Sequence, residues 1–189
     1  MNNIHATVPL RVDVQIAAEE SVVPDDADWQ TWVDAALCGA GRDASGVVTV
    51  RLVTEDESAA LNLSYRDKPG PTNILAFPGP GDELTGHKLS NDELMNTSCN
   101  AADAEALDME LGDLVICLPI ACREAEEQGK HPVAHLAHLA VHGTLHLIGY
   151  DHESEADAGR MESLETRILG GLGITDPYVD AQQTSNNSV

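Results

Sequence analysis

Residues 138–152 read HLAVHGTLHLIGYDH, a stretch in which histidine recurs at helical spacing. His142 and His146 are four residues apart in a segment of strong helical character, so both imidazoles leave the same helix face about one turn apart. Gly149 can adopt a positive φ, which would end the helix and turn the chain back. His152 would then approach the same point. The spacing therefore predicts that His142, His146 and His152 bind one metal ion.

Three neutral imidazoles suit zinc, and three protein ligands leave a fourth coordination position for water or substrate, as is typical of catalytic zinc. We therefore expect one Zn²⁺ per chain. A zinc peptidase of the zincin type carries Glu directly after the first His as its general base, whereas this chain has Gly143. The simpler alternative is a helix with unrelated histidines, which the glycine and the third histidine at matching offsets disfavour.

His138 is a competing ligand, because residues 138, 142 and 146 also form a regular series along a helix. Side chains spread over two helical turns, roughly 12 Å at 1.5 Å per residue, cannot all reach one zinc at about 2 Å. We therefore keep His152 as the third ligand and treat His138 as a neighbour. Pro132 in the first turn and leucines on most faces predict that this helix is buried and central.

The segments around this helix alternate between strand and helix patterns. Alternating or continuous apolar residues predict four strands, at about residues 8–16, 47–53, 74–77 and 111–118. Helical spacing and start signals predict helices at about residues 25–39, 54–63, 119–129, 132–148 and 154–170. The fold class is therefore expected to be α+β, with about a four-stranded mixed sheet, packed helices and a central helix that carries the His-based metal motif.

A chain of 189 residues is long enough for one domain with a proper core and too short for two comfortable ones. We expect a single metal-hydrolase-like domain over residues 1–178, with an acidic insertion at about 79–110 and a flexible tail at 179–189. Four cysteines without paired spacing indicate reduced thiols. No apolar run approaches a membrane span, so a cytoplasmic protein without membrane association is expected.

The charge balance is strongly acidic: 10 Lys and Arg against 32 Asp and Glu give a net charge of −22, which repels nucleic acid at long range. Arg66 and Lys68 stand out because they are two of only ten basic residues and lie in an expected loop rich in turn formers. Ordinary loop solvation would explain them. A small basic groove on an acidic surface would explain them too. Asp113, at the start of the fourth strand, is either a turn residue or faces the metal cleft.

Several segments together resemble the YbeY family of rRNA maturation factors. They are residues 142–152, Tyr65-Arg66, the run 71–78 (PTNILAFP), the run 111–116 (LGDLVI) and Met161-Glu-x-x-Glu165, in order over about residues 45–178. The resemblance implies His142, His146 and His152 as zinc ligands and Arg66 as a catalytic or RNA-binding residue. The stretch between the third and fourth strands is longer here than in the family, and the net charge is strongly negative.

The resemblance also implies an activity: a zinc-dependent, single-strand-specific endoribonuclease in maturation of the small-subunit rRNA 3′ end and in ribosome quality control. Ribosomal RNA and the small ribosomal subunit are the implied partners. Our hypothesis is that zinc activates water and polarises a phosphoryl oxygen while Arg66 stabilises developing charge, with Asp113 or Asp151 as candidate proton acceptors. The alternatives are a different zinc hydrolase and a non-catalytic, zinc-stabilised ribosome assembly factor. Protein partners and oligomeric state do not follow from the sequence.

Overall fold

The computed structural model describes residues 9–18, 23–42, 46–79, 110–152 and 154–174. Within these ranges one four-stranded sheet has the order β1-β2-β4-β3. Its strands are β1 (Arg11–Ile16), β2 (Val47–Val53), β3 (Ile74–Pro78) and β4 (Glu110–Cys117). β1, β2 and β4 run parallel, and β3 pairs antiparallel with β4 at the edge. The expected α+β fold with a mixed sheet is confirmed.

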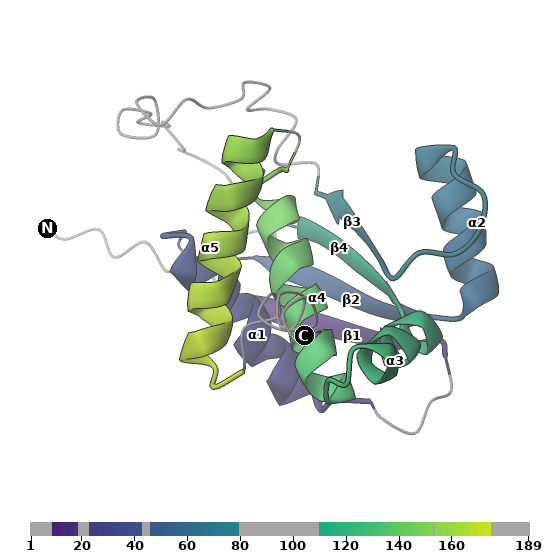
Figure 1. Cartoon of the computed structure of the whole chain (residues 1–189), viewed down its shortest axis with the longest axis horizontal. Helices are drawn as coiled ribbons and strands as arrows, with labels where there is room; N and C mark the ends of the chain where they lie inside the picture. The colour runs from purple at the N-terminus through teal and green to yellow at the C-terminus, as the bar shows by residue number, and fades with distance from the viewer. Residues whose placement is uncertain (1–8, 19–22, 43–45, 80–109, 153, 175–189) are drawn as a thin grey trace, which may run out of the picture.

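The two faces of the sheet carry different sets of residues, because side chains alternate along each strand. Val50 of β2 and Leu114 of β4 are fully buried in the larger of two apolar clusters, which lies on the face covered by α1 (Asp26–Gly39) and α4 (Pro132–Leu147). α5 (Glu155–Gly171) packs on these two helices and adds residues to the same cluster. Val115 and Leu75 lie in a smaller cluster on the opposite face. The other helices are α2 (Glu55–Arg66) and α3 (Leu118–Glu127) (Figure 1).

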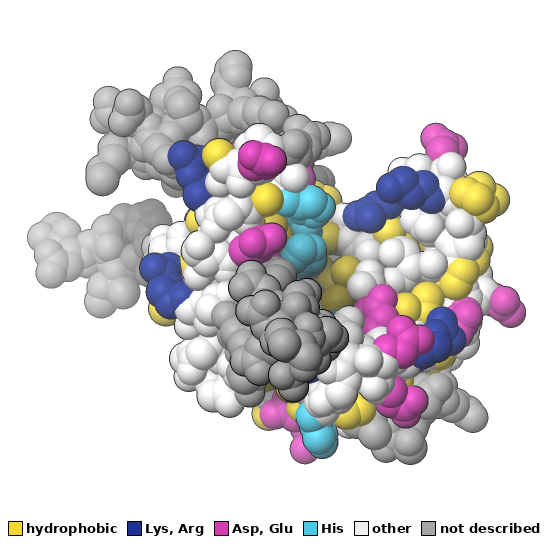
Figure 2. Space-filling view, viewed as in Figure 1, with side chains coloured by type: hydrophobic (Ala, Val, Ile, Leu, Met, Phe, Trp, Pro, Cys, Tyr) yellow, Lys and Arg dark blue, Asp and Glu magenta, His cyan; other side chains and the backbone are white. Residues whose placement is uncertain are grey.

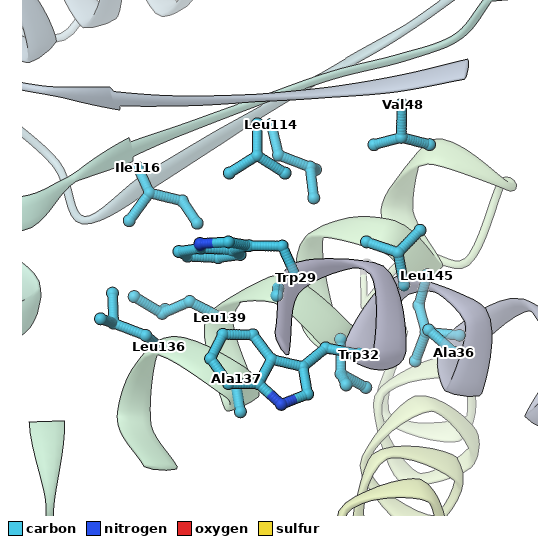
Figure 3. Close-up of a cluster of buried hydrophobic side chains, with 14 of the residues drawn as sticks. Trp29, Trp32, Ala36, Val48, Leu114, Ile116, Leu136, Ala137, Leu139 and Leu145 are labelled. Atoms are coloured by element: carbon cyan, nitrogen blue, oxygen red, sulfur yellow. The ribbon is translucent and has the colours of Figure 1, made fainter. Parts of the chain in front are cut away.

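The two tryptophans anchor the larger cluster. Trp29 and Trp32 of α1 are buried, and their ring centroids are 4.9 Å apart in an edge-to-face arrangement. Figure 3 shows Trp29 between the sheet residues Leu114 and Ile116 and the α4 residue Leu139. The two rings therefore help to hold α4, the helix that carries the His motif, against the sheet.

Helix starts follow the expected signals. The Thr54 hydroxyl accepts a hydrogen bond from the Glu57 N–H at 3.4 Å, and the Ser154 hydroxyl accepts one from the Asp157 N–H at 3.2 Å. Pro132 occupies the first turn of α4, where its missing N–H costs little. These local side-chain contacts explain why the starts could be predicted from the sequence.

Some boundaries differ from the prediction. β1 begins at Arg11 rather than near residue 8, and Pro9 lies just before it without an N–H to donate to a neighbouring strand. α2 continues to Arg66, so this residue ends a helix and does not lie in the loop as expected. Asp67, with φ of 53°, ends the helix, and Lys68 does lie in the loop.

The expected acidic insertion and the tail fall almost entirely outside the described residues, so both stay predictions, as does the single-domain boundary.

Of the five helices in the described ranges, none combines the length and apolar character needed to cross a membrane. Within the same ranges Cys38 and Cys117 are free thiols, and burial raises the pKa of Cys117.

Candidate metal centre

Helix α4 presents two of the expected ligands from one face. Leu136 and Leu145 on other faces are fully buried, which fixes the rotation of the helix about its axis. His142 and His146 then lie one turn apart, with ring centroids separated by 4.6 Å. Their Nε2 atoms are 3.1 Å apart. The helix therefore directs the same nitrogen of both rings toward one point.

The end of α4 brings the third imidazole to that point. Gly149 has a φ of +90°, a conformation that favours glycine, and its N–H bonds to the His146 carbonyl at 3.1 Å. The Tyr150 N–H bonds to the Leu145 carbonyl at 3.0 Å. The chain turns back here, so the ring of His152 lies 5.0 Å from that of His146, centroid to centroid. Local backbone geometry therefore produces the convergence expected from the spacing.

The three histidines form a donor set that fits a divalent ion. One ligand nitrogen from each of His142, His146 and His152 lies within 4.8 Å of the others. Two nitrogens on one tetrahedral zinc, each about 2.0–2.1 Å from it, lie roughly 3.3 Å apart. The 3.1 Å between the Nε2 atoms of His142 and His146 is close to that separation. The His152 side chain is 59% exposed, so the group is open to solvent.

The electrostatics of the group favour neutral imidazole, the form that binds metal. Burial lowers the pKa of His146, and the neighbouring His142 and His152 lower it further. Both causes disfavour the imidazolium ion: burial removes water, and each neighbouring ring becomes a like charge when protonated. His146 therefore remains a potential ligand at a lower pH than an isolated histidine.

Sequence reasoning missed a buried carboxylate behind the group. Glu165 of α5 is fully buried, and its Oε1 lies 2.5 Å from His142 Nδ1. Its Oε2 lies 3.6 Å from His138 Nε2, and His138 groups with His142 and Glu165 and not with His152. The sequence did carry a signal, because Glu165 falls at a core position beside Met161, Leu164 and Ile168. An acidic residue in an apolar stripe indicates a specific partner.

Gly143 occupies the position at which a zincin has its catalytic Glu, and its surroundings explain the difference. A Cβ atom at Gly143 would lie 2.7 Å from Ile74 Cδ1 and 2.8 Å from Leu114 Cδ2. Both contacts belong to the sheet under α4, so this face of the helix is in close contact with β3 and β4. A Glu side chain here would start inside the core.

Of the two carboxylates considered as proton acceptors, only Asp151 lies beside the histidines. Its Oδ1 accepts the His152 N–H at 2.7 Å and lies 4.0 Å from His152 Nδ1. Asp113 is exposed on β4 and pairs with Phe77 in the register of the sheet. It lies on the face opposite to Leu114, and therefore away from α4. Asp113 is thus neither a turn residue nor directed at the metal group.

Arg66 and Lys68 are exposed and lie at the C-terminal end of α2 and in the loop that follows. Figure 2 shows Lys and Arg side chains over this end of α2, on the same face of the molecule as the exposed His side chains. Neither residue forms an ion pair within the described ranges. The structure therefore puts two cationic side chains without a close ion pair in the described ranges on the same face as the His group.

A hydrogen-bond network of His135, Glu124 and Asn73 ties the loop before β3 to the helices. His135 of α4 is 4% exposed, and its Nε2 lies 2.9 Å from Glu124 Oε2 of α3. The Glu124 oxygens also accept from Asn73 Nδ2 at 3.1 and 3.3 Å. Burial lowers the pKa of His135, although the Glu124 hydrogen bond opposes the shift. This network has a structural role, because it fixes the start of β3. In this it differs from the three expected metal ligands, which are open to solvent.

The comparisons with known proteins cover most of the chain. The family model described as Endoribonuclease YbeY matches residues 14–173. A protein named Endoribonuclease YbeY from Nitrosococcus oceani is 44% identical over 169 residues, which span 89% of this chain and 97% of the relative. One of the same name from Methylococcus capsulatus is 45% identical over 161 residues, 85% of this chain and 91% of the relative. The chain therefore belongs to the Endoribonuclease YbeY family.

Proposed function

We propose that this protein is a zinc-dependent endoribonuclease that cleaves single-stranded RNA, acting in maturation of the small-subunit rRNA 3′ end and in ribosome quality control. The observation that carries the proposal is the convergence of the His142, His146 and His152 nitrogens within 4.8 Å, in a member of an endoribonuclease family. The family supports RNA as the substrate. The donor set supports a metal as the source of catalytic power.

Zinc is the ion that the donor set supports best, because three imidazole ligands suit a borderline-soft ion. When bound, a divalent ion would supply Lewis acidity, lowering the pKa of water and polarising a phosphoryl oxygen. The chain's own residues hold the three nitrogens in place and leave one side of the group open. Asp151, whose Oδ1 accepts the backbone N–H of His152, is the proposed proton acceptor.

Arg66 is proposed to bind the phosphate and to stabilise charge as the phosphodiester breaks. Its guanidinium has fixed planar donors that match phosphate oxygens. The helix end and loop that carry Arg66 and Lys68 are held by side chains of α2. Asn62 Nδ2 donates to the Gly70 carbonyl at 2.9 Å, and the Ser58 hydroxyl donates to the Thr72 carbonyl at 2.8 Å. Both cations are therefore on an ordered segment, despite the acidic surface elsewhere.

The residue before Arg66 supports a single-stranded substrate. Tyr65 is 68% exposed, and its ring packs edge-to-face on Phe77 with centroids 4.9 Å apart. An exposed aromatic ring beside cations can stack an unpaired base, whereas bases in a duplex are already stacked. Tyr65 and Arg66 together would therefore favour RNA whose bases are unpaired.

The remaining expectations belong to the same proposal. We propose that the protein acts in the cytoplasm with ribosomal RNA and the small ribosomal subunit as partners, which the resemblance to rRNA maturation factors supports. A zinc-stabilised assembly factor without catalysis is the rival. It would restore ribosome maturation in cells even when a metal-free but folded variant replaced the wild type.

The test is cleavage of a structured and an unstructured RNA by zinc-loaded wild type, Arg66→Ala and His142→Ala. Wild type should cut unstructured RNA, Arg66→Ala should keep its metal and lose cleavage, and His142→Ala should lose both. Arg11→Ala is the matched control, because Arg11 is an exposed arginine on β1 at the opposite edge of the sheet from β3. Cleavage that survives both metal removal and the Arg66 substitution would refute the proposal, as would hydrolysis of peptides in place of RNA.

A further inference from the structure

Glu165 is a fully buried carboxylate inside an otherwise apolar helix face. It lies on α5 beside Met161 and Leu169, which are also buried. Removing a carboxylate from water is costly unless specific groups compensate its charge. The buried carboxylate of Glu165 therefore indicates that neighbouring polar groups interact with its charge.

Two imidazoles of α4 lie against Glu165. Oε1 lies 2.5 Å from His142 Nδ1, and Oε2 lies 3.6 Å from His138 Nε2. The other ring nitrogen of His142, Nε2, lies 3.1 Å from His146 Nε2. His142 therefore faces a carboxylate with one nitrogen and the proposed metal position with the other.

This arrangement selects one tautomer of His142. A neutral imidazole carries a single N–H, and an ionised carboxylate can only accept. The hydrogen bond to Glu165 therefore places the proton on Nδ1 and leaves the Nε2 lone pair free for a metal. The nearby negative charge also makes Nε2 a stronger donor to a cation, as second-layer carboxylates do in metal sites.

A second ion bound by His138, His142 and Glu165 is the alternative explanation of the same cluster. Two ligand atoms on one small divalent ion lie more than about 3 Å apart, given metal–ligand distances of about 2.0–2.2 Å. The 2.5 Å between His142 Nδ1 and Glu165 Oε1 is a hydrogen-bond distance and leaves no room for an ion between them. A second ion would also require His142 to lose both ring protons.

We infer that Glu165 is a positioning residue for the metal centre: it orients His142, holds it in the Nδ1–H tautomer and strengthens metal binding through Nε2. This inference rests on the proposed metal site and adds a residue to it. The effect of Glu165 reaches the metal only through His142, so metal affinity is the direct readout and RNA cleavage is not needed to test it.

The experiment measures zinc affinity by competition with a chromophoric chelator for wild type, Glu165→Gln and Glu165→Leu. Gln keeps an acceptor for the Nδ1–H and removes the charge, whereas Leu removes both. We expect weaker binding in that order, with a loss of about 10- to 100-fold for the leucine variant. Glu162→Gln is the matched control, because Glu162 is an exposed acid on the same helix, and its affinity should equal that of wild type.

Nuclear magnetic resonance of the metal-free protein distinguishes a positioning role of Glu165 from a merely structural one. Long-range ¹⁵N–¹H spectra should show His142 as the Nδ1–H tautomer in wild type, and as mainly the Nε2–H tautomer in Glu165→Leu. If the leucine variant does not fold, the glutamine variant still tests the affinity. Equal zinc affinity in wild type and Glu165→Gln, or two zinc ions per wild-type chain, would overturn the inference. Failure of wild type to bind zinc would instead refute the proposed function.

Discussion

Substitution of Gly143 by alanine tests whether packing against the sheet excludes a side chain from the zincin base position. The new Cβ would lie 2.7 Å from Ile74 Cδ1 and 2.8 Å from Leu114 Cδ2, whereas ordinary contacts begin at 3.4 Å. The neighbours must therefore move by about 0.6–0.7 Å. Leu114 is fully buried, so its side chain has little free space. Overpacking of this kind costs about 1–3 kcal/mol.

The helix itself opposes that cost, since replacing glycine by alanine in a helix interior gains about 1 kcal/mol. Gly143→Ala should therefore destabilise the protein by about 0–2 kcal/mol. Gly159→Ala isolates the helix contribution, because Gly159 lies in α5 with no atom within 4 Å of the position that a Cβ would take. It should be stabilising by about 0.5–1 kcal/mol.

The assay is urea unfolding of both variants and wild type in the presence of a chelator, so that metal binding does not shift the equilibrium. The free energies of unfolding should differ between the two alanine variants by about 0.5–3 kcal/mol. If Gly143→Ala is as stabilising as Gly159→Ala, the inference that this face of α4 packs closely against β3 and β4 is wrong. Gly143→Glu should destabilise the protein more than Gly143→Ala, because its carboxylate would be buried without a partner. It should also show no peptidase activity.

Three further predictions concern the metal, pH and RNA. Zinc at 100 times its dissociation constant should raise the free energy of unfolding of wild type by about 2.7 kcal/mol. The same zinc concentration should leave the free energy of unfolding of His152→Ala unchanged. Identical melting temperatures of chelated and zinc-loaded wild type would contradict a specific zinc site. Because the folded-state pKa of His135 lies below its ordinary value of 6.5, the unfolded chain binds more protons below that pH. Metal-free protein should thus lose stability as pH falls below about 6.5, and His135→Gln should flatten that loss in urea titrations at several pH values. Lys68→Ala should weaken RNA binding about equally for all sequences and lower the salt dependence, measured by fluorescence anisotropy; an unchanged salt slope would exclude a phosphate contact.

The sequence by itself determined the elements and the ligand geometry, because both depend on local periodicity. Alternation in β2, the caps at Thr54 and Ser154, and the four-residue spacing of His142 and His146 each act within a few residues. The turn at Gly149 is local too. The convergence of three imidazoles could therefore be expected before the structure was known, while their binding of zinc stays a prediction.

Only the tertiary structure decided which residues surround those ligands. Glu165 meets His142 across 23 positions of sequence, because α5 packs on α4. The close contact at Gly143 depends on β3 and β4, and Asp113 faces away from α4 because of the register of β4. Contacts such as those of Glu165 and Gly143 arise from packing between distant segments, which local patterns do not encode.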